Sequence, residues 1–370
     1  MKLNYDQAVH CAKVIENYFG DFTRIDEYMR EQKLNSLAEL PFSLPGCGPE
    51  EDLFSDFDMN PQDMEFEIVE LEASRWQLYL DIISSHNNLA SPGRNVRLAI
   101  QEKNTKKWVG FIRISSPVIN MKPRNELLGY VMTNELETTK AFNKSSGMGF
   151  VIVPAQPFGY NYLGGKLLAA ICCSHEVRVI LNKKYNMNTC LFETTSLYGT
   201  TKQVSQYDGM KPFLRFGGTT DSDFLPMMHG KPYEELKNYV EGIVGQFIPA
   251  DASSRKLKIS NAIVSMIKVS LKSHKEDYDR FMNTIEKAKG LTERKRYYYC
   301  SYGIKNFKEI VAGKTDKIIP DENFDKHHLS NVIDWWKKKA TNRYETLKNE
   351  NRLGRDIEVW TGDKEIDIIR

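Results

Sequence analysis

The stretch at 151–168 reads VIVPAQPFGYNYLGGKLL and decides the fold class. Its apolar start, which Pro154 ends, predicts a buried strand, and its glycines separate that strand from an apolar segment of helical length. A helix that begins just after such a loop has unpaired backbone N–H groups at its N-terminus, and these groups bind phosphate well. The stretch matches neither G-x-x-x-x-G-K-[ST] nor G-x-G-x-x-G, so it predicts an anion-binding loop of another kind.

The segments on either side repeat this alternation of strands and helices. Apolar runs at 96–100 and 108–114 flank a polar tip at 103–106 and predict a β-hairpin. The other predicted strands are 66–71, 149–153, 189–192 and 212–216, and the predicted helices are 3–40, 74–85, 166–185, 255–272, 275–289 and 327–348. This order predicts a mixed α/β fold followed by a mainly helical extension.

Composition narrows the class of protein. Hydrophobic residues make up 41% and charged residues 27% of the 370 residues, which is typical of a folded globular chain. No apolar run approaches the ~20 residues that cross a bilayer, and the N-terminus lacks the apolar core of a signal peptide. The six cysteines form no disulfide framework, and no residue spacing is typical of a metal site. We therefore expect a cytoplasmic protein without metal or membrane contact, in the host cell cytoplasm if a phage encodes it.

Charge is distributed unevenly along the chain. Residues 1–70 hold 5 Lys and Arg against 16 Asp and Glu, whereas residues 251–350 hold 22 against 14. A field of one sign attracts partners of the opposite sign. We expect an acidic helical segment at 1–65 that could contact a protein partner, an α/β domain at 66–230, and a basic, mainly helical extension at 231–370.

The loop within 151–168 resembles that of the Gcn5-related N-acetyltransferase superfamily. That superfamily binds the pyrophosphate of acetyl-coenzyme A through a [QR]-x-x-G-x-[GA] loop after its fourth strand. Gln156 and Gly159 match this motif, while Asn161 replaces its last Gly or Ala. The resemblance covers about 66–220 and implies a mixed, mostly antiparallel sheet with flanking helices. It also implies that acetyl-coenzyme A or another acyl-coenzyme A contacts Val153, Gln156, Phe158, Gly159, Tyr160, Asn161 and Leu163.

A second resemblance is to the domain of protein A of the Druantia anti-phage system. The family's N-L-A-S, L-E-T-F, G-T-x-Y and W-x-x-x-G-x-T motifs are matched in part, with Phe213 in place of the Trp. The matching residues are Asn161, Glu193, Thr194, Gly199, Thr200, Gly217 and Thr219. Phage DNA-modifying acyltransferases of the Mom type share the same broad fold. Together these resemblances imply a nucleic-acid target, with DNA favoured, in phage–host conflict.

Three residues are candidates for catalysis by such an acyltransferase. In the superfamily a tyrosine after the fifth strand often protonates the departing coenzyme thiolate, and Tyr198 and Tyr207 both follow the strand predicted at 189–192. A phenol, with a pKa of about 10, can serve as that acid within hydrogen-bond reach. Tyr207 is preferred because SQYDGMKPF resembles the family's segment before its last strand. Glu193, at the end of the predicted strand, could act as a general base or bind the incoming amine, and all three could instead be structural.

Two segments of the extension combine cations with aromatic rings. ERKRYYYCSYG at 293–303 and WWKKK at 335–339 offer phosphate contacts and stacking faces for bases. The candidate nucleic-acid contacts are Arg294, Lys295, Arg296, Tyr297, Tyr299, Trp335, Lys337, Lys338 and Lys339. An alternating strand with tyrosines on both faces explains the first segment equally well.

The leading hypothesis is an acyl-coenzyme A-dependent acyltransferase-like protein that modifies or binds nucleic acid in phage–host conflict. The alternative is a catalytically inactive fold of the same kind that serves as a DNA-binding or protein-interaction module. Binding of acetyl-coenzyme A distinguishes the two.

Overall fold

The computed structural model describes most of the chain. The described residues are 2–20, 33–34, 49–85, 93–130, 136–196, 205–220, 225–228, 230–252, 255–290 and 294–360. Within these ranges, no helix combines the length and the apolar character needed to cross a membrane.

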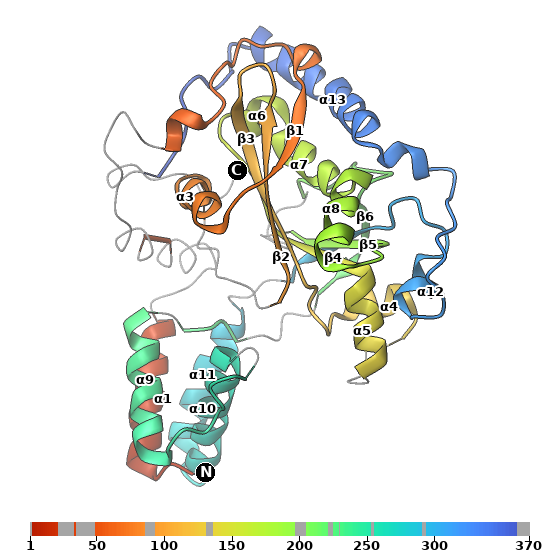
Figure 1. The fold of residues 1–370 in the computed structure, drawn as a ribbon. Coiled ribbons are helices and arrows are strands. Elements are labelled where there is room, and N and C mark those ends of the chain that lie inside the picture. Colours follow the sequence, from red (N-terminus) through yellow and green to blue (C-terminus); the bar gives the residue numbers. More distant parts are fainter. Residues whose placement is uncertain are drawn as a thin grey trace. The chain divides into compact units, whose positions relative to one another are not determined.

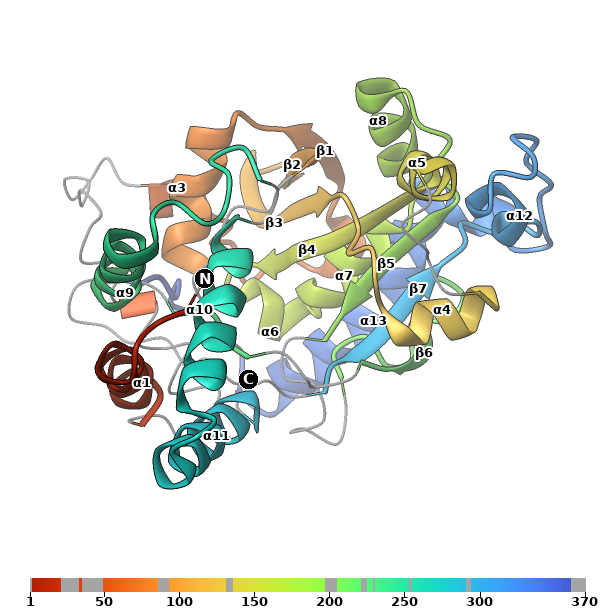
Figure 2. The same cartoon turned by 90° about the horizontal axis from the view of Figure 1, so that it is seen from below.

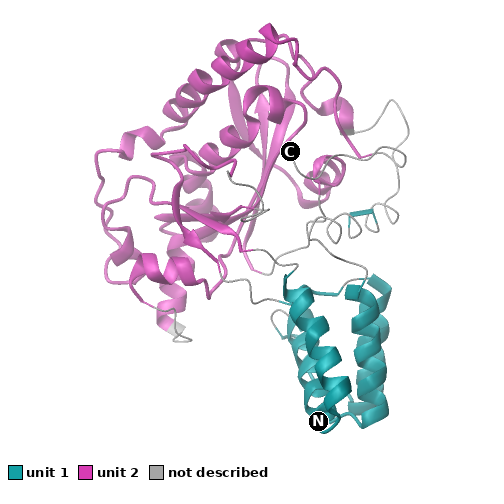
Figure 3. Ribbon diagram, turned by 180° about the vertical axis from the view of Figure 1, so that it is seen from behind, with its two compact units in different colours: residues 1–39, 222–293, 368–370 teal, residues 40–221, 294–367 magenta. Residues whose placement is uncertain are grey.

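The chain divides into two compact units, which are coloured separately in Figure 3. The first unit comprises residues 1–39, 222–293 and 368–370, and the second comprises residues 40–221 and 294–367. The larger part of the first unit is therefore an insertion into the chain of the second.

The first unit is a helical bundle with its own core. Its helices are α1 (Tyr5–Gly20), α9 (Gly230–Val244), α10 (Arg255–Leu271) and α11 (Lys275–Gly290). Apolar residues three or four positions apart, such as Ala8, Ala12, Ile15 and Phe19 of α1, give each helix one buried stripe. The four stripes meet in one apolar core.

The second unit is built around one mixed sheet. Within the described residues the strand order is β1-β2-β3-β4-β5-β7-β6, and Figure 2 shows β4, β5, β7 and β6 following one another. The strands are β1 (Phe66–Glu70), β2 (Asn95–Glu102), β3 (Lys107–Ser115), β4 (Ser146–Pro154), β5 (Leu191–Thr195), β6 (Arg215–Thr219) and β7 (Arg296–Cys300). Neighbouring strands are antiparallel except for β4 and β5. This arrangement confirms the expected mixed, mostly antiparallel α/β fold.

The sheet opens between its two parallel strands. β4 pairs with β5 only where Ser146–Gly149 faces Leu191–Thr194. Beyond Gly149, β4 continues to Pro154 in register with β3. The loop after β4 therefore lies at the open end of the sheet.

Helices cover both faces of the sheet. They are α3 (Ala73–Ile83), α4 (Lys122–Leu128), α5 (Leu136–Ser145), α6 (Phe158–Tyr162), α7 (Gly164–Cys172), α8 (His175–Tyr185), α12 (Phe307–Val311) and α13 (Leu329–Asn349), with 3-10 helices at Pro49–Asp52, Pro61–Asp63 and Phe324–His327. Tyr79 of α3 stacks on Phe111 of β3 at 5.1 Å, whereas Leu168 of α7 lies against the preceding strand residue, Gly110. Because successive strand residues point to opposite faces, α3 and α7 cover opposite sides of the sheet (Figure 1). A Cβ at Gly110 would lie 2.5 Å from the Leu168 side chain, so a glycine here lets α7 approach closely.

Several elements differ from those expected from the sequence. The helix expected at 166–185 is two helices, because the Ser174 hydroxyl accepts the Val177 N–H and caps α8 as a separate helix. The strand expected at 212–216 lies at 215–219 instead. Of the helix expected at 3–40, residues 21–32 and 35–40 lie outside the described residues.

The compact units also divide the chain differently from the three parts expected. Residues 296–300, expected within the basic extension, form β7, which pairs with both β5 and β6. The second unit therefore includes 294–367, while residues from the expected N-terminal segment and from 231–293 share the helical bundle. Strand pairing between residues distant in sequence places β7 in the second unit, and the shared apolar core of α1, α9, α10 and α11 holds the bundle together.

Candidate functional site

The loop after β4 uses its own backbone donors. The Gly159 N–H donates to the Ala155 carbonyl and the Asn161 N–H to the Pro157 carbonyl, each at 2.8 Å. The Tyr160 N–H donates to Oε1 of Gln156 at 3.0 Å. These N–H groups are the ones that the sequence motif would direct at a pyrophosphate. In this conformation they are engaged within the protein, so the loop as it stands does not fit that group.

A segment near the C-terminus covers the same loop. The Asn161 amide donates to the Gly354 carbonyl, and its Oδ1 accepts the Gly354 N–H, both at 2.9 Å. The Glu358 N–H donates to the Gln156 carbonyl at 3.0 Å. Because the neighbouring Ala155 N–H points to β3, the Gln156 carbonyl lies on the opposite edge of the strand, where β5 has diverged. Residues 354–358 therefore occupy the open edge of the chain leaving β4.

The other predicted coenzyme contacts have structural roles in this conformation. Phe158 is buried in the core, while Val153 in β4 is partly exposed. The guanidinium of Arg343 in α13 lies 4.7 Å from the centre of the Tyr160 ring. Leu163 adopts a left-handed conformation, φ 54°, at the junction between α6 and α7.

Tyr207, the preferred general acid, lies inside the protein. Its side chain is 4% exposed, and its ring packs edge-on against Tyr298 of β7 at 5.3 Å. Burial raises the pKa of Tyr207, and hydrogen bonding to Thr194 of β5 acts in the opposite direction. The phenol thus lies beside β5 near the opening of the sheet, without access to solvent. The other candidate, Tyr198, lies outside the described residues.

Glu193 lies within β5 rather than at its end, and it forms a fully buried ion pair. Nη1 of Arg124 in α4 lies 3.3 Å from both carboxylate oxygens, and both side chains are 0% exposed. Arg124 also donates to the carbonyls of Val118 and Ile119. Burial raises the pKa of Glu193, and the Arg124 charge opposes that rise. The pair fastens the loop before α4 to the sheet, which is a structural role.

Two cations from separate elements contact Asp208, and a third, Lys339 in α13, acts on one of them, Lys166; we refer to Lys166, Arg296 and Lys339 as the cation cluster. Nζ of Lys166 in α7 donates to the Asp208 carbonyl at 2.6 Å, and Nη1 of Arg296 in β7 lies 3.2 Å from Oδ2 of Asp208. Burial lowers the pKa of Lys166, and the positive charge of Lys339 in α13 lowers it further. Such mutual repulsion indicates local positive potential, which favours an anion.

The two segments predicted to contact nucleic acid meet at the cation cluster. The first segment supplies Arg296, and the second supplies Lys339, whose Nζ lies 5.3 Å from the centre of the Trp335 ring. Nζ of Lys337 instead donates to the Gln62 carbonyl at 2.7 Å. The remaining cations of the two segments are exposed, and they are Arg294, Lys295 and Lys338.

The tyrosines of β7 belong mainly to the core. Tyr297 is 0% exposed and Tyr298 is 1% exposed, because successive strand residues pack against both faces of the sheet. Tyr299 is partly exposed. The prediction that Tyr297 stacks with bases is therefore wrong, since its ring is not accessible.

One exposed ring near the cluster was not singled out from the sequence. Phe216 of β6 is 56% exposed, and it pairs directly across the strands with Tyr298 of β7. β6 is the last strand of the described sheet, which leaves this ring at the sheet edge. An apolar run such as PFLRF does not indicate which of its residues an edge strand leaves in solvent.

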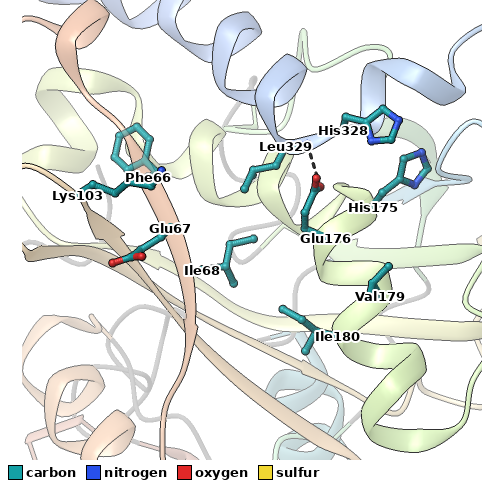
Figure 4. A pocket seen from close by; sticks show the side chains of 10 residues that line it. All are labelled: Phe66, Glu67, Ile68, Lys103, His175, Glu176, Val179, Ile180, His328 and Leu329. Carbon is teal, nitrogen blue, oxygen red and sulfur yellow. Dashed lines mark hydrogen bonds between the residues drawn. The ribbon is translucent and has the colours of Figure 1, made fainter.

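A separate pocket of about 670 Å³ lies between β1 and α8 (Figure 4). Its lining residues are Phe66, Glu67, Ile68, Lys103, His175, Glu176, Val179, Ile180, His328 and Leu329. The Glu176 carboxylate accepts the Leu329 N–H at 2.9 Å, which ties α8 to α13. His175 is 6% exposed, and burial lowers its pKa to about 4. The pocket includes none of the site residues predicted from the sequence.

No metal site stands out in the part of the chain that the structure describes: no three His, Cys, Asp or Glu side chains there gather in a way that could hold an ion. The fold and the cation cluster together define an α/β protein with a candidate anion-binding surface at one end of its sheet.

Residues 52–208 match the family described as Druantia protein DruA, a component of the Druantia anti-phage defence system. The matched segment begins before β1, contains β1 to β5 and ends at Asp208. No curated protein and no solved structure matches the chain significantly.

Proposed function

We propose that this protein acts in anti-phage defence by binding nucleic acid, with phosphate groups against the cation cluster. The match of residues 52–208 to the DruA family supports the biological role. The chemistry of the cluster supports the partner, because closely spaced cations attract the phosphate backbone.

One observation carries the proposal: two basic and aromatic segments that lie far apart in the sequence converge on Lys166. Arg296 is held beside it through Asp208, and Lys339 is close enough to lower its pKa. Asp208 is the one carboxylate that these contacts involve, so the three positive charges outnumber it. Such a surplus is what a nucleic-acid backbone would neutralise.

Asp208 has a positioning role in this proposal. Its pKa is lowered despite partial burial, because the Ser205 N–H, the Tyr298 hydroxyl and Arg296 all stabilise the charged carboxylate. The Tyr298 hydroxyl donates to Oδ1 at 2.8 Å, while Oδ2 accepts from the Ser205 N–H and from Arg296. The carboxylate therefore orients Arg296 from the sheet toward Lys166.

A salt series measured by fluorescence anisotropy tests the proposal. Wild-type protein is expected to bind a labelled oligonucleotide with an affinity that falls steeply as salt rises. Lys339→Ala should flatten that dependence by about 0.9 per lost contact on duplex DNA. Lys305→Ala is the matched control, because Lys305 is also exposed but follows the opposite end of β7. Absence of wild-type binding at low salt, or equal effects of both substitutions, would contradict the proposal.

Acyl transfer is a second candidate, favoured by the position of the Gln156 loop directly after the fourth strand of a mixed sheet. Since residues 354–358 cover the loop, binding of an acyl-coenzyme A would require that segment to leave. Calorimetry with acetyl-coenzyme A on the full chain and on a chain ending at 352 tests this candidate. Heat of binding that appears or increases after the truncation supports it, and no binding by either folded protein argues against it.

A further inference from the structure

Phe216 is a large apolar side chain that the fold leaves mostly in solvent. It is 56% exposed on β6, although the apolar residues that precede it, Phe213 and Leu214, are 1% and 2% exposed. Solvent exposure of a large apolar side chain carries an unfavourable hydration free energy that burial would relieve. A single exposed apolar residue is common, so only the residues around the ring can indicate whether it has a function.

The Phe216 ring lies on the same face of the sheet as Tyr298 and Arg296, and both of these side chains contact Asp208. Phe216 and Tyr298 are directly opposed across β6 and β7, with ring centroids 5.8 Å apart. The Tyr298 hydroxyl donates to Asp208 at 2.8 Å, and Asp208 in turn pairs with Arg296. Arg296 lies two residues before Tyr298 on β7, so both side chains project from the same face.

Two glycines shape the backbone just after the ring. Gly217 and Gly218 follow Phe216, and the pairing register with β7 shifts between Phe216 and Gly218. A Cβ at Gly217 would lie 2.7 Å from the Tyr297 ring, and Gly218 has φ 117°, a conformation that favours glycine. The glycines let the edge strand approach Tyr297 closely on the opposite face, and the bulge turns the strand just after the exposed ring.

We infer that Phe216 stacks on an unpaired base of a single nucleic-acid strand whose phosphates lie against the cation cluster. This inference rests on the proposed function and adds the form of the nucleic acid. Every base presents an aromatic face, so stacking on one ring tolerates any sequence. In a duplex the base faces are covered by neighbouring pairs, so the ring can contribute only where a base is unstacked. The partly exposed Trp335, next to Lys339, offers a second ring beside the cluster.

The experiment compares Phe216→Ala and Phe216→Trp with wild type on three labelled probes: oligothymidine, the same chain built from abasic nucleotides, and a duplex. On oligothymidine, Phe216→Ala should weaken binding by roughly 5- to 100-fold with an unchanged salt slope, and Phe216→Trp should restore it. On the abasic and duplex probes, the two variants should match wild type. Ile319→Ala, which removes another large apolar side chain with 46% exposure, is the control for lost surface area.

Two results would overturn the inference: Phe216→Ala binding oligothymidine as tightly as wild type, or losing the same factor on all three probes. Failure of the proposed function looks different, because wild-type protein would then bind none of the probes at low salt. Circular dichroism of each variant confirms that a loss is not caused by unfolding.

Discussion

Asn161 and Gly354 are joined by two reciprocal hydrogen bonds, each 2.9 Å long, although 193 residues separate them in the chain. A Cβ at Gly354 would lie 2.6 Å from the Pro157 side chain, so the proline ring leaves no space for a side chain at this position. The loop after β4 and the segment near the C-terminus therefore stabilise one another.

Asn161→Ala tests the strength of this contact. The substitution removes both hydrogen bonds and leaves the partly buried Gly354 N–H and carbonyl without their partner; a fully buried group in that state costs about 1–3 kcal/mol, and water relieves part of this cost here. We expect the free energy of unfolding in urea to fall by roughly 2–4 kcal/mol. The control is Asn188→Ala, because Asn188 makes one side-chain hydrogen bond, to the Asp316 carbonyl, in a more exposed place. Equal losses in the two variants would show that the Asn161 contact has no special weight.

The buried pair of Arg124 and Glu193 predicts a strong asymmetry between single and double substitutions. Arg124→Met leaves a buried carboxylate without its partner, and such single substitutions typically cost ~3–5 kcal/mol. Adding Glu193→Leu removes the unpaired charge and should recover part of the loss. Urea unfolding of both singles and the double gives the coupling energy. Simple additivity of the two single effects would mean that the charges do not depend on one another.

His175 predicts a loss of stability in mild acid. Its pKa in the folded protein is about 4, below the ~6.5 of an unfolded histidine, because burial disfavours the charged ring. As pH falls from about 6.5 toward 4, the unfolded state binds a proton that the folded state does not, so stability falls by up to roughly 3 kcal/mol. His175→Gln should show a shallower decline in melting temperature over this range. A wild-type curve that is flat from pH 6.5 to 4, or one that the substitution leaves unchanged, would contradict the prediction.

Tyr207→Phe separates the two candidate functions. If the protein transfers an acyl group with Tyr207 as the acid, turnover should fall by roughly 10²–10⁴-fold while coenzyme affinity is retained. If it acts by binding nucleic acid alone, the variant should bind as wild type does, because the buried ring still packs on Tyr298. Acyl transfer assays and anisotropy on the same preparation give both answers. Equal turnover by the two proteins would exclude Tyr207 as the proton donor.

Local pattern predicted much of the first half of the sheet. The hairpin of β2 and β3 and the buried run of β4 are recorded in apolar periodicity and turn residues that lie close together in sequence. The break between α7 and α8 was also readable, because Ser174 carries a capping hydroxyl at its position. An uninterrupted apolar composition outweighed that signal in the prediction of one long helix.

Long-range pairing could not be predicted in the same way. The sequence of β7 allowed two interpretations, a nucleic-acid contact or a strand with tyrosines on both faces. Only the pairing with β5 and β6 shows that Tyr297 and Tyr298 are core residues. Asn161 departs from the coenzyme motif and so indicated a changed loop. Its contact with Gly354 could not be predicted, because no local sequence pattern links two residues so far apart in the chain. Phe216 was missed because its exposure depends on being at the sheet edge.

The insertion of helices between β6 and β7 has a consequence for synthesis on the ribosome. β5 ends at Thr195, whereas β7, the strand that covers its free edge, begins only at Arg296. A nascent chain must therefore carry an uncovered β5, and a β6 without its neighbour, while α9, α10 and α11 emerge and acquire their local contacts. Uncovered strand edges recruit other chains. A recombinant fragment limited to the family segment 52–208 would keep that edge permanently, so preparations for study need the chain through α13.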